Sequence, residues 1–277
     1  MSGVLERSLG ILELLVEHPE GLQVSAIAAR LDVPASAAHR LLRELSDRGY
    51  VRQLRNQGDY QLTIKLAALG LAFIGRAGVT DIAQPSLDRL AASSRELVRL
   101  SVIDGESLVW VGVAQGATSG LRYDPGREQG VTVHLASSAG GRAWLSTMSD
   151  EDAVERAVRQ GIAPDFPAGP NAPRTVTDLL SVLAATRARG FAVATDSYLA
   201  GMAAMAVPVR RARGDGEVIG CLSIAGPAVR LVEDRMRGLL PDLLDAAQEI
   251  GAAAEASFFF KRSGASAPPP DVPRPAA

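Results

Sequence analysis

The chain has 277 residues, of which 47% are hydrophobic and 22% charged, with a formal net charge of −2 at pH 7. This is the composition of a soluble globular protein of about two domains, and it excludes a polycation, so nucleic-acid binding would need a local basic patch. A single cysteine, Cys221, excludes an intrachain disulfide, and no segment approaches the roughly 20 apolar residues of a membrane span. We expect a cytoplasmic protein without a signal peptide.

The first fifty residues predict three short helices. In the first, apolar residues recur at three- and four-residue steps, which indicates an amphipathic helix. Its predicted apolar stripe is Leu5, Leu9, Leu12 and Leu15 or Val16. A second helix follows in LQVSAIAARL, with Ser25 as its expected N-cap. Pro34 pushes Val33 out of helical geometry and so separates it from a third helix. The predicted buried stripe of this third helix is Ala38, Leu41, Leu42 and Leu45.

Two short strands are predicted after the third helix, in YVRQLRNQGDYQL, around the turn Asn56–Asp59. Three helices followed by a two-stranded ribbon form the pattern of a winged helix-turn-helix domain. Helices that share so small a core leave one face of the third helix outside. The candidate DNA contacts on that face and near the ribbon are Ser36, Ala37, His39, Arg40, Arg43, Arg52 and Arg55.

The local charge agrees with DNA binding. Residues 36–65 carry six Lys or Arg against three Asp or Glu, and such a surface can neutralise phosphates while the helix enters a major groove. Arg52 and Arg55 are expected to contact phosphates rather than bases. For His39, a DNA contact and a capping or buried role are equally open. A winged helix used only for protein contacts is the alternative for the whole face.

The segment TIKLAALGLAFIGRAG predicts a linker helix that is apolar almost all round. Such an apolar surface is unfavourable in water, and pairing with a second copy of the chain is the simplest way to bury it. We therefore expect a homodimer or a homotetramer.

The remainder of the chain predicts an α+β domain. Two strands in residues 97–115 are joined by Asp104-Gly105, a strong hairpin signal. Three further strands are expected in FAVATDS, MAAMAVPV and EVIGCLSIAG. Helices are expected from near Ser137, after Ser149 and after residue 174, and one long helix closes the domain. The last residues are rich in Pro, Ala and Ser and predict a disordered tail.

No catalytic constellation is visible. The chain has three histidines, His18, His39 and His134, and no GxSxG, CxxC or HExxH motif. A zinc site built on one cysteine and one domain histidine would need several carboxylates, so we expect neither metal nor cofactor. The alternatives to a DNA-binding regulator are an enzyme with an N-terminal interaction module and a protein-assembly module.

The sequence resembles the IclR-type bacterial transcription regulators over residues 4–256. The resemblance rests on six segments in order: LERSLGILELL, SAIAARLDVPASAAHRLLRELSDRGYV, HLASSAGGRAWLS, RARGFAV, AVPV and LSIAGPAVRL. It implies a winged helix-turn-helix domain at 1–63, a dimerising linker helix at 64–78, a GAF-like effector-binding domain at 79–257, and a tail at 258–277. The implied function is ligand-responsive regulation, expected to be repression. The operator should be a near-palindrome with half-sites about one turn apart, roughly 34–36 Å.

The resemblance also implies an effector pocket, formed by the helix start in SSAGGR, the loop before AVPV and the strand ending in SIAGP. Carried over residue by residue, the effector-binding residues are Ala139, Gly140, Asp196, Met202, Ala204, Ser223 and Ala225. Backbone N–H groups at a helix start suit a carboxylate, because they lack partners within the helix.

Several positions depart from the family's pattern. Many relatives carry Arg-Cys where this chain has Ala203-Ala204, and some carry a second Ser in place of Ala225. The pocket should therefore be more apolar, and an aromatic or alkyl acid or a neutral hydrophobic compound is expected rather than a two- or three-carbon acid. At Ala35-Ser36-Ala37, relatives usually have a polar or basic residue, then Ser and Thr. Either the remaining polar residues suffice, or the wing and DNA shape supply part of the readout.

Overall fold

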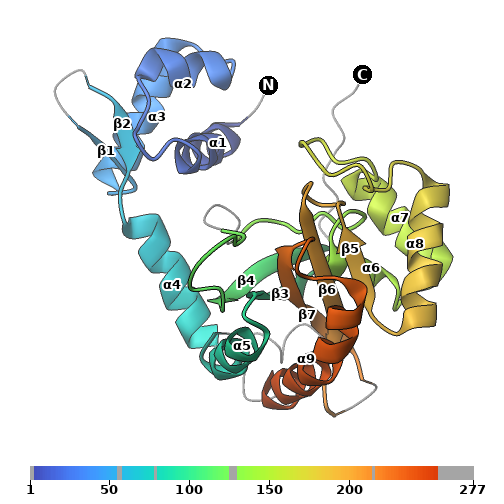
Figure 1. The fold of residues 1–277 in the computed structure, drawn as a ribbon. Helices are drawn as coiled ribbons and strands as arrows, with labels where there is room; N and C mark the ends of the chain where they lie inside the picture. The colour runs from blue at the N-terminus through green and yellow to red at the C-terminus, as the bar shows by residue number, and fades with distance from the viewer. Residues whose placement is uncertain (1–2, 55–57, 78–79, 125–129, 214–215, 255–277) are drawn as a thin grey trace. The chain divides into compact units, whose positions relative to one another are not determined.

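The computed structural model describes residues 3–54, 58–77, 80–124, 130–213 and 216–254. The chain divides into two compact units, residues 1–76 and 77–277, and each is described by itself (Figure 1). The predicted tail and the boundary at 257/258 lie outside the described residues. Within those residues, no helix is long and apolar enough to cross a membrane.

The first unit has the predicted winged helix-turn-helix elements. They are α1 (Val4–Val16), α2 (Val24–Arg30), α3 (Ala35–Asp47), β1 (Val51–Gln53) and β2 (Tyr60–Leu62). The two strands pair antiparallel, with Val51 opposite Leu62. The four apolar residues predicted for the buried side of α3 are all buried. The three leucines pack with Ile27, Val51 and Tyr60, and Ala38 packs with Ala28 and Val33. The opposite side of α3 is therefore left at the surface.

The apolar stripe predicted for α1 was partly wrong. Ile11 and Leu15 are the buried residues of this helix, whereas Leu5, Leu9 and Val16 are exposed. The helix carries apolar residues on two faces, and periodicity alone does not tell which of them meets the core. The expected N-cap of α2 was also wrong, because this helix begins at Val24 after Gln23, which makes no side-chain cap.

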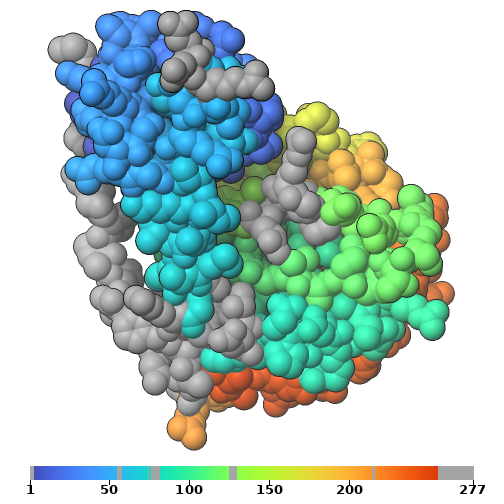
Figure 2. Space-filling view, turned by 90° about the vertical axis from the view of Figure 1, so that its left-hand side faces the viewer, coloured from blue at the N-terminus to red at the C-terminus, as the bar shows by residue number. Residues whose placement is uncertain are grey.

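The helix α4 (Lys65–Ala77) follows the wing, as predicted. Its apolar side chains are largely open to solvent in the single chain: Leu69 is 49%, Leu71 69% and Phe73 62% exposed. Figure 2 shows this helix in cyan at the surface.

The second unit is built on a five-stranded sheet in the order β4-β3-β7-β6-β5, with all neighbours antiparallel. Its strands are β3 (Leu97–Asp104), β4 (Ser107–Gln115), β5 (Ala192–Thr195), β6 (Met202–Arg210) and β7 (Val218–Pro227). The expected hairpin at Asp104-Gly105 joins β3 to β4, and Gly105 has the positive φ of 58° that such a turn requires.

Helices cover both faces of this sheet (Figure 1). On one face lie α5 (Thr80–Ser94) and α9 (Glu233–Ala253); on the other lie α6 (Ala139–Leu145), α7 (Asp150–Gln160) and α8 (Val176–Arg189). The central strand β7 is buried along almost its whole length, because both of its faces are covered. The expected α+β fold class is confirmed.

The short helix α6 packs against the sheet, and it contains two glycines, Gly140 and Gly141. A Cβ on Gly141 would lie 2.3 Å from the carbonyl oxygen of Leu135, so no larger residue fits there. Gly140 faces Ser101, Leu108 and Cys221 at ordinary contact distances. Burial raises the pKa of the Cys221 thiol, so this cysteine is a protonated, apolar part of the core.

Candidate DNA-binding surface and effector cavity

The outward face of α3 carries the predicted recognition residues. Ser36, His39, Arg40 and Arg43 are exposed, and Ala37 is half-buried at the edge of the face. None of the four polar side chains makes a hydrogen bond or ion pair to another residue in the part of the chain that the structure describes. The described part of the fold does not use these side chains, so their donors are left to solvent or to a bound partner.

The wing adds one described arginine. Arg52 is exposed on β1 and donates from Nη2 to Oε1 of Gln61 on β2, at 3.0 Å. The amide nitrogen of Gln61 in turn donates to the carbonyl oxygen of Pro19. This chain of contacts orients Arg52 on the surface of the ribbon. Arg55, also predicted to contact DNA, lies outside the described residues.

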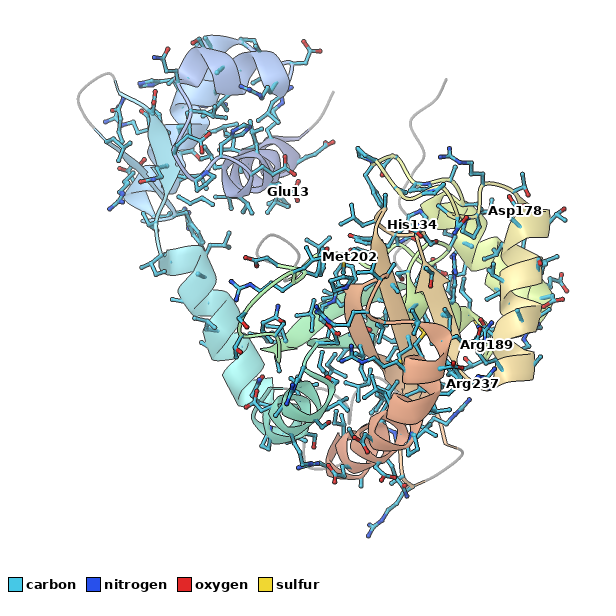
Figure 3. All side chains as sticks on the ribbon, in the orientation of Figure 1. Glu13, His134, Asp178, Arg189, Met202 and Arg237 are labelled. Carbon is cyan, nitrogen blue, oxygen red and sulfur yellow. The ribbon has the colours of Figure 1, made fainter. Side chains whose placement is uncertain are left out.

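The second unit contains a cavity between α6 and the sheet; about 460 Å³ of space there is free of protein atoms, and this volume includes open solvent. Six of the seven predicted effector residues line it: Ala139, Gly140, Met202, Ala204, Ser223 and Ala225. Met202, labelled in Figure 3, begins β6. Ala139 and Gly140 begin α6, and the sheet register places Ala204 of β6 opposite Ala225 of β7.

Asp196, the seventh predicted residue, does not line the cavity. Its carboxylate accepts a hydrogen bond from the backbone N–H of Gly201 at 2.6 Å, and its own N–H donates to the carbonyl oxygen of Met202 at 2.8 Å. It adopts a left-handed conformation with φ of 49°. Asp196 thus shapes the loop between β5 and β6, which carries Tyr198 and Leu199 to the cavity wall.

Four larger residues in the wall were missed by the sequence reasoning: Arg99, Trp110, Tyr123 and Tyr198. Arg99 is 7% exposed, and its guanidinium carbon lies 4.0 Å from the centre of the Trp110 ring. It is the only charged residue among the described residues that line the cavity. Trp110 packs edge to face against Tyr198, with ring centres 5.6 Å apart. The sequence does mark one of these residues, because Arg99 is a charged residue within the otherwise mostly apolar strand LVRLSVID.

The start of α6 offers fewer free donors than expected. Ser138 is its N-cap, and the Ser138 hydroxyl accepts a hydrogen bond from the N–H of Gly141 at 3.0 Å. One of the unpartnered donors predicted there is therefore already satisfied, and α6 has only seven residues. The one charged side chain among the described residues of the cavity wall is that of Arg99.

A second buried arginine supports the wall from behind. Arg142 is 4% exposed and donates to the carbonyl oxygen of Ala136 at 2.9 Å, to that of Val193 at 2.7 Å and to Oγ of Ser197 at 2.6 Å. Burial lowers the pKa of Arg142 to about 10, so the guanidinium stays charged at neutral pH. Its three acceptors are all neutral, and one of them precedes Tyr198 in the loop over the cavity.

Among the described residues, no group of three or more His, Cys, Asp and Glu could hold a metal ion. His134, labelled in Figure 3, does not line the cavity; its ring packs edge to face on Phe166, and its Nδ1 lies 2.8 Å from Oγ of Ser137.

A winged helix-turn-helix unit with a basic outward face, joined to an α+β unit with a cavity lined by aromatic and small residues, is the architecture of a transcription regulator. Comparison with known families agrees. Residues 4–55 match the IclR helix-turn-helix domain, and residues 71–252 match the model described as bacterial transcriptional regulator IclR C-terminal. The chain belongs to the IclR family of bacterial transcriptional regulators, and it is a DNA-binding regulator, not an enzyme.

Individual relatives are more distant. The HTH-type transcriptional repressor AllR of Salmonella typhimurium is 29% identical over 252 residues, which are 90% of this chain and 89% of AllR; AllR of Escherichia coli K12 is 28% identical over the same length. The crystal structure of IclR from Thermotoga maritima has a TM-score of 0.69 at 25% identity, covering 89% of this chain and 96% of that one. An IclR homolog from Microbacterium hydrocarbonoxydans, complexed with 4-hydroxybenzoate, has a TM-score of 0.71 at 23% identity, covering 92% and 100%.

Proposed function

We propose that this chain is a repressor that binds a near-palindromic operator as a homodimer or homotetramer, and that a small organic acid or hydrophobic effector in the cavity modulates this binding. The observation that carries the proposal is the outward face of α3, where exposed polar residues have no partner among the described residues. The curated relatives named as repressors support the direction of regulation.

In this proposal α3 enters the major groove, and the wing contacts the backbone. Ser36, Ala37, His39, Arg40 and Arg43 contact bases or phosphates, while Arg52 and Arg55 contact phosphates. The unit at 1–63 binds DNA, the helix at 64–78 pairs two copies, and 79–257 binds the effector. The exposed apolar side chains of α4 support that pairing. Two α3 helices in successive grooves require half-sites about one turn apart, roughly 34–36 Å.

The effector site in this proposal is the cavity between α6 and the sheet. Ala139, Gly140, Met202, Ala204, Ser223 and Ala225 contact the ligand, and Asp196 positions the loop above it. The Microbacterium homolog, whose structure holds 4-hydroxybenzoate, supports an aromatic acid as one candidate ligand. The ligand can alter DNA binding only if it binds one arrangement of the dimer better than the other.

Fluorescence anisotropy tests the DNA-binding part. The full chain is titrated onto DNA from upstream of its own gene and onto a scrambled duplex, at two salt concentrations. Tight binding to the native fragment alone is the expected result. Arg40→Ala and Arg43→Ala should each weaken this binding by roughly 10- to 100-fold, because each removes a groove or phosphate contact. A lost phosphate contact also lowers the log–log salt slope by about one.

The matched control is Arg237→Ala in the second unit. Arg237 is equally exposed and forms only a surface pair with Glu233, so its removal should leave DNA affinity unchanged. If Arg40→Ala and Arg43→Ala bound the native fragment as tightly as the control, the assignment of the α3 face would be wrong. Weak and equal binding of the wild-type chain to both duplexes would count against a specific operator in that fragment.

A further inference from the structure

We propose that the effector is an aryl carboxylate whose carboxylate binds Arg99 and whose ring packs against Trp110 and Tyr198. The inference rests on the proposed function, because it assumes that the cavity between α6 and the sheet is the effector site. It adds the chemical class of the ligand and the residues that select it.

The charges around the cavity favour an anion. Arg99 is the only charged group among the described lining residues, and it lies on β3 between the fully buried Val98 and Leu100. Arg142 places a second buried guanidinium behind the wall, and its three hydrogen-bond acceptors are neutral. Each of these buried cations raises the electrostatic potential around it, since burial weakens the screening by water. A carboxylate is stabilised in such a space, and a cation is excluded.

The geometry of Arg99 suits a carboxylate in particular. The guanidinium carbon of Arg99 lies over the Trp110 ring, 4.0 Å from the ring centre, in a cation–π contact. Stacking uses the face of this group, whereas hydrogen bonds use its edge, where N–H groups form a fork that matches two carboxylate oxygens. Stacking also removes rotamer freedom that binding would otherwise have to remove. Arg99 lies opposite Ser223 in the sheet, and the Ser223 hydroxyl donates to the Arg99 carbonyl oxygen at 3.3 Å.

Ser138 provides a second donor in the same cavity. Its hydroxyl oxygen accepts from the N–H of Gly141, and its own proton is not donated to any acceptor in the described part of the chain. Ser138 is 5% exposed, so a ligand oxygen is the acceptor that this proton lacks. In this proposal, one ligand carboxylate accepts from both Ser138 and Arg99.

The rest of the wall favours a flat ring over an aliphatic chain. The chain has two tryptophans and four tyrosines, and three of these six line this one cavity: Trp110, Tyr123 and Tyr198. Trp110 and Tyr198 stand at 88° to each other, so together they offer a ring face and a ring edge. Aromatic rings stack on faces and pack against edges, and both contacts are stronger than those of a saturated ring. Ala204 and Ala225 leave room beside them.

Intrinsic fluorescence can report binding in the cavity. The chain has two tryptophans, so Trp144→Phe leaves Trp110 as the only reporter. In this background, benzoate and 4-hydroxybenzoate are compared with benzamide, which lacks the charge, and with cyclohexanecarboxylate, which lacks the flat ring. Calorimetry on the otherwise unchanged chain checks each affinity. We expect both benzoates to bind at least tenfold more tightly than either benzamide or cyclohexanecarboxylate.

Three variants test the role of Arg99. Arg99→Gln should weaken benzoate binding by roughly 10- to 100-fold, the range expected for a charge-assisted hydrogen bond, and should leave benzamide unchanged. Arg99→Lys keeps the charge without the fork and should recover part of the loss. The matched control is Arg156→Gln: Arg156 lies over the other tryptophan, Trp144, at 4.6 Å, and does not line the cavity. This change removes the same kind of stacking and should leave benzoate affinity unchanged. Circular dichroism confirms that each variant is folded.

The inference is overturned if neither benzoate binds, if benzamide or cyclohexanecarboxylate binds as tightly as benzoate, or if Arg99→Gln binds benzoate like the Arg156→Gln control. These outcomes leave the proposed function intact as long as the wild-type chain binds its operator in the anisotropy assay. If the wild-type chain bound benzoate but no operator, the repressor function would instead be wrong and the proposed class of ligand would stand.

Discussion

The two units of the chain hold their key arginines in opposite environments. Arg40 and Arg43 are exposed on α3 and make no contact with another described charged or polar group, whereas Arg99 and Arg142 are almost completely buried in the second unit. An exposed guanidinium keeps its water shell in the free protein, so the fold gains little from it and loses little without it. A buried guanidinium has lost its water shell and needs protein groups to stabilise its charge, so removing either the guanidinium or those groups lowers the stability of the fold.

This difference decides how each surface can be studied. Truncation of Arg40 or Arg43 should change DNA affinity and leave stability within about 0.5 kcal/mol of wild type. A substitution of a buried residue in the second unit should change both the stability of the fold and the affinity for a ligand, because the same side chains contribute to both. Substitutions there have to conserve shape, and each needs a stability measurement beside the binding measurement.

The largest effect on stability should come from Glu96, a buried carboxylate that is 1% exposed. Arg230 binds it with two hydrogen bonds of 2.6 and 2.8 Å, and Arg235 approaches to 3.2 Å. Gly226 makes room for the carboxylate, because a Cβ there would lie 2.3 Å from it. Glu96→Gln keeps the shape but leaves two guanidinium groups without their counter-charge. We expect a loss of about 3 kcal/mol in the free energy of unfolding, measured by urea denaturation; both arginines are partly solvated, which limits the loss.

The control for this prediction is Glu233→Gln, at the exposed pair with Arg237. A helical surface pair of this kind contributes less than about 0.5 kcal/mol. If the two variants lost the same amount, the buried cluster around Glu96 would be no more important than a surface pair.

A smaller effect should come from the two serine N-caps. Ser138 caps the buried α6 and Ser149 caps the exposed α7, at 3.0 and 3.1 Å from the N–H groups of Gly141 and Asp152. Replacing either by Ala should lower the free energy of unfolding by about 1 kcal/mol. Only Ser138→Ala should also weaken benzoate binding, because only Ser138 lines the cavity. Equal benzoate affinities in the two variants would remove Ser138 from the ligand site.

The sequence predicted most of the fold because most of its signals are local. The buried stripe of α3, the hairpin at Asp104-Gly105 and the capping residue Ser149 each depend on residues a few positions apart. The stripe of α1 failed for the same reason: its two apolar faces look alike locally, and only tertiary packing chooses between them.

The cavity could be predicted only in part, because its wall is assembled over long distances in the sequence. Arg99 lies beside Ser223 through the pairing of β3 with β7, and no local pattern reports that register. The resemblance to a family supplied the α6, β6 and β7 positions that relatives share. It did not supply Arg99 or Trp110, which are not in the shared segments. These two residues carry the prediction about the ligand.

The smallest predicted effect is on the pH dependence of stability, and it comes from His134, a buried base like Arg142 but a much weaker one. Desolvation lowers its pKa below the ordinary 6.5, although the carbonyl of Gly161 and the carboxylate of Asp165 act in the opposite direction. As the pH falls below 6.5, the unfolded chain binds a proton that the folded chain does not, so the free energy of unfolding falls. His134→Asn keeps an acceptor for Ser137 and cannot titrate. Between pH 7.5 and 5.5, urea denaturation should therefore show a smaller loss of stability for His134→Asn than for the wild type, and parallel losses would show that His134 is not the group responsible.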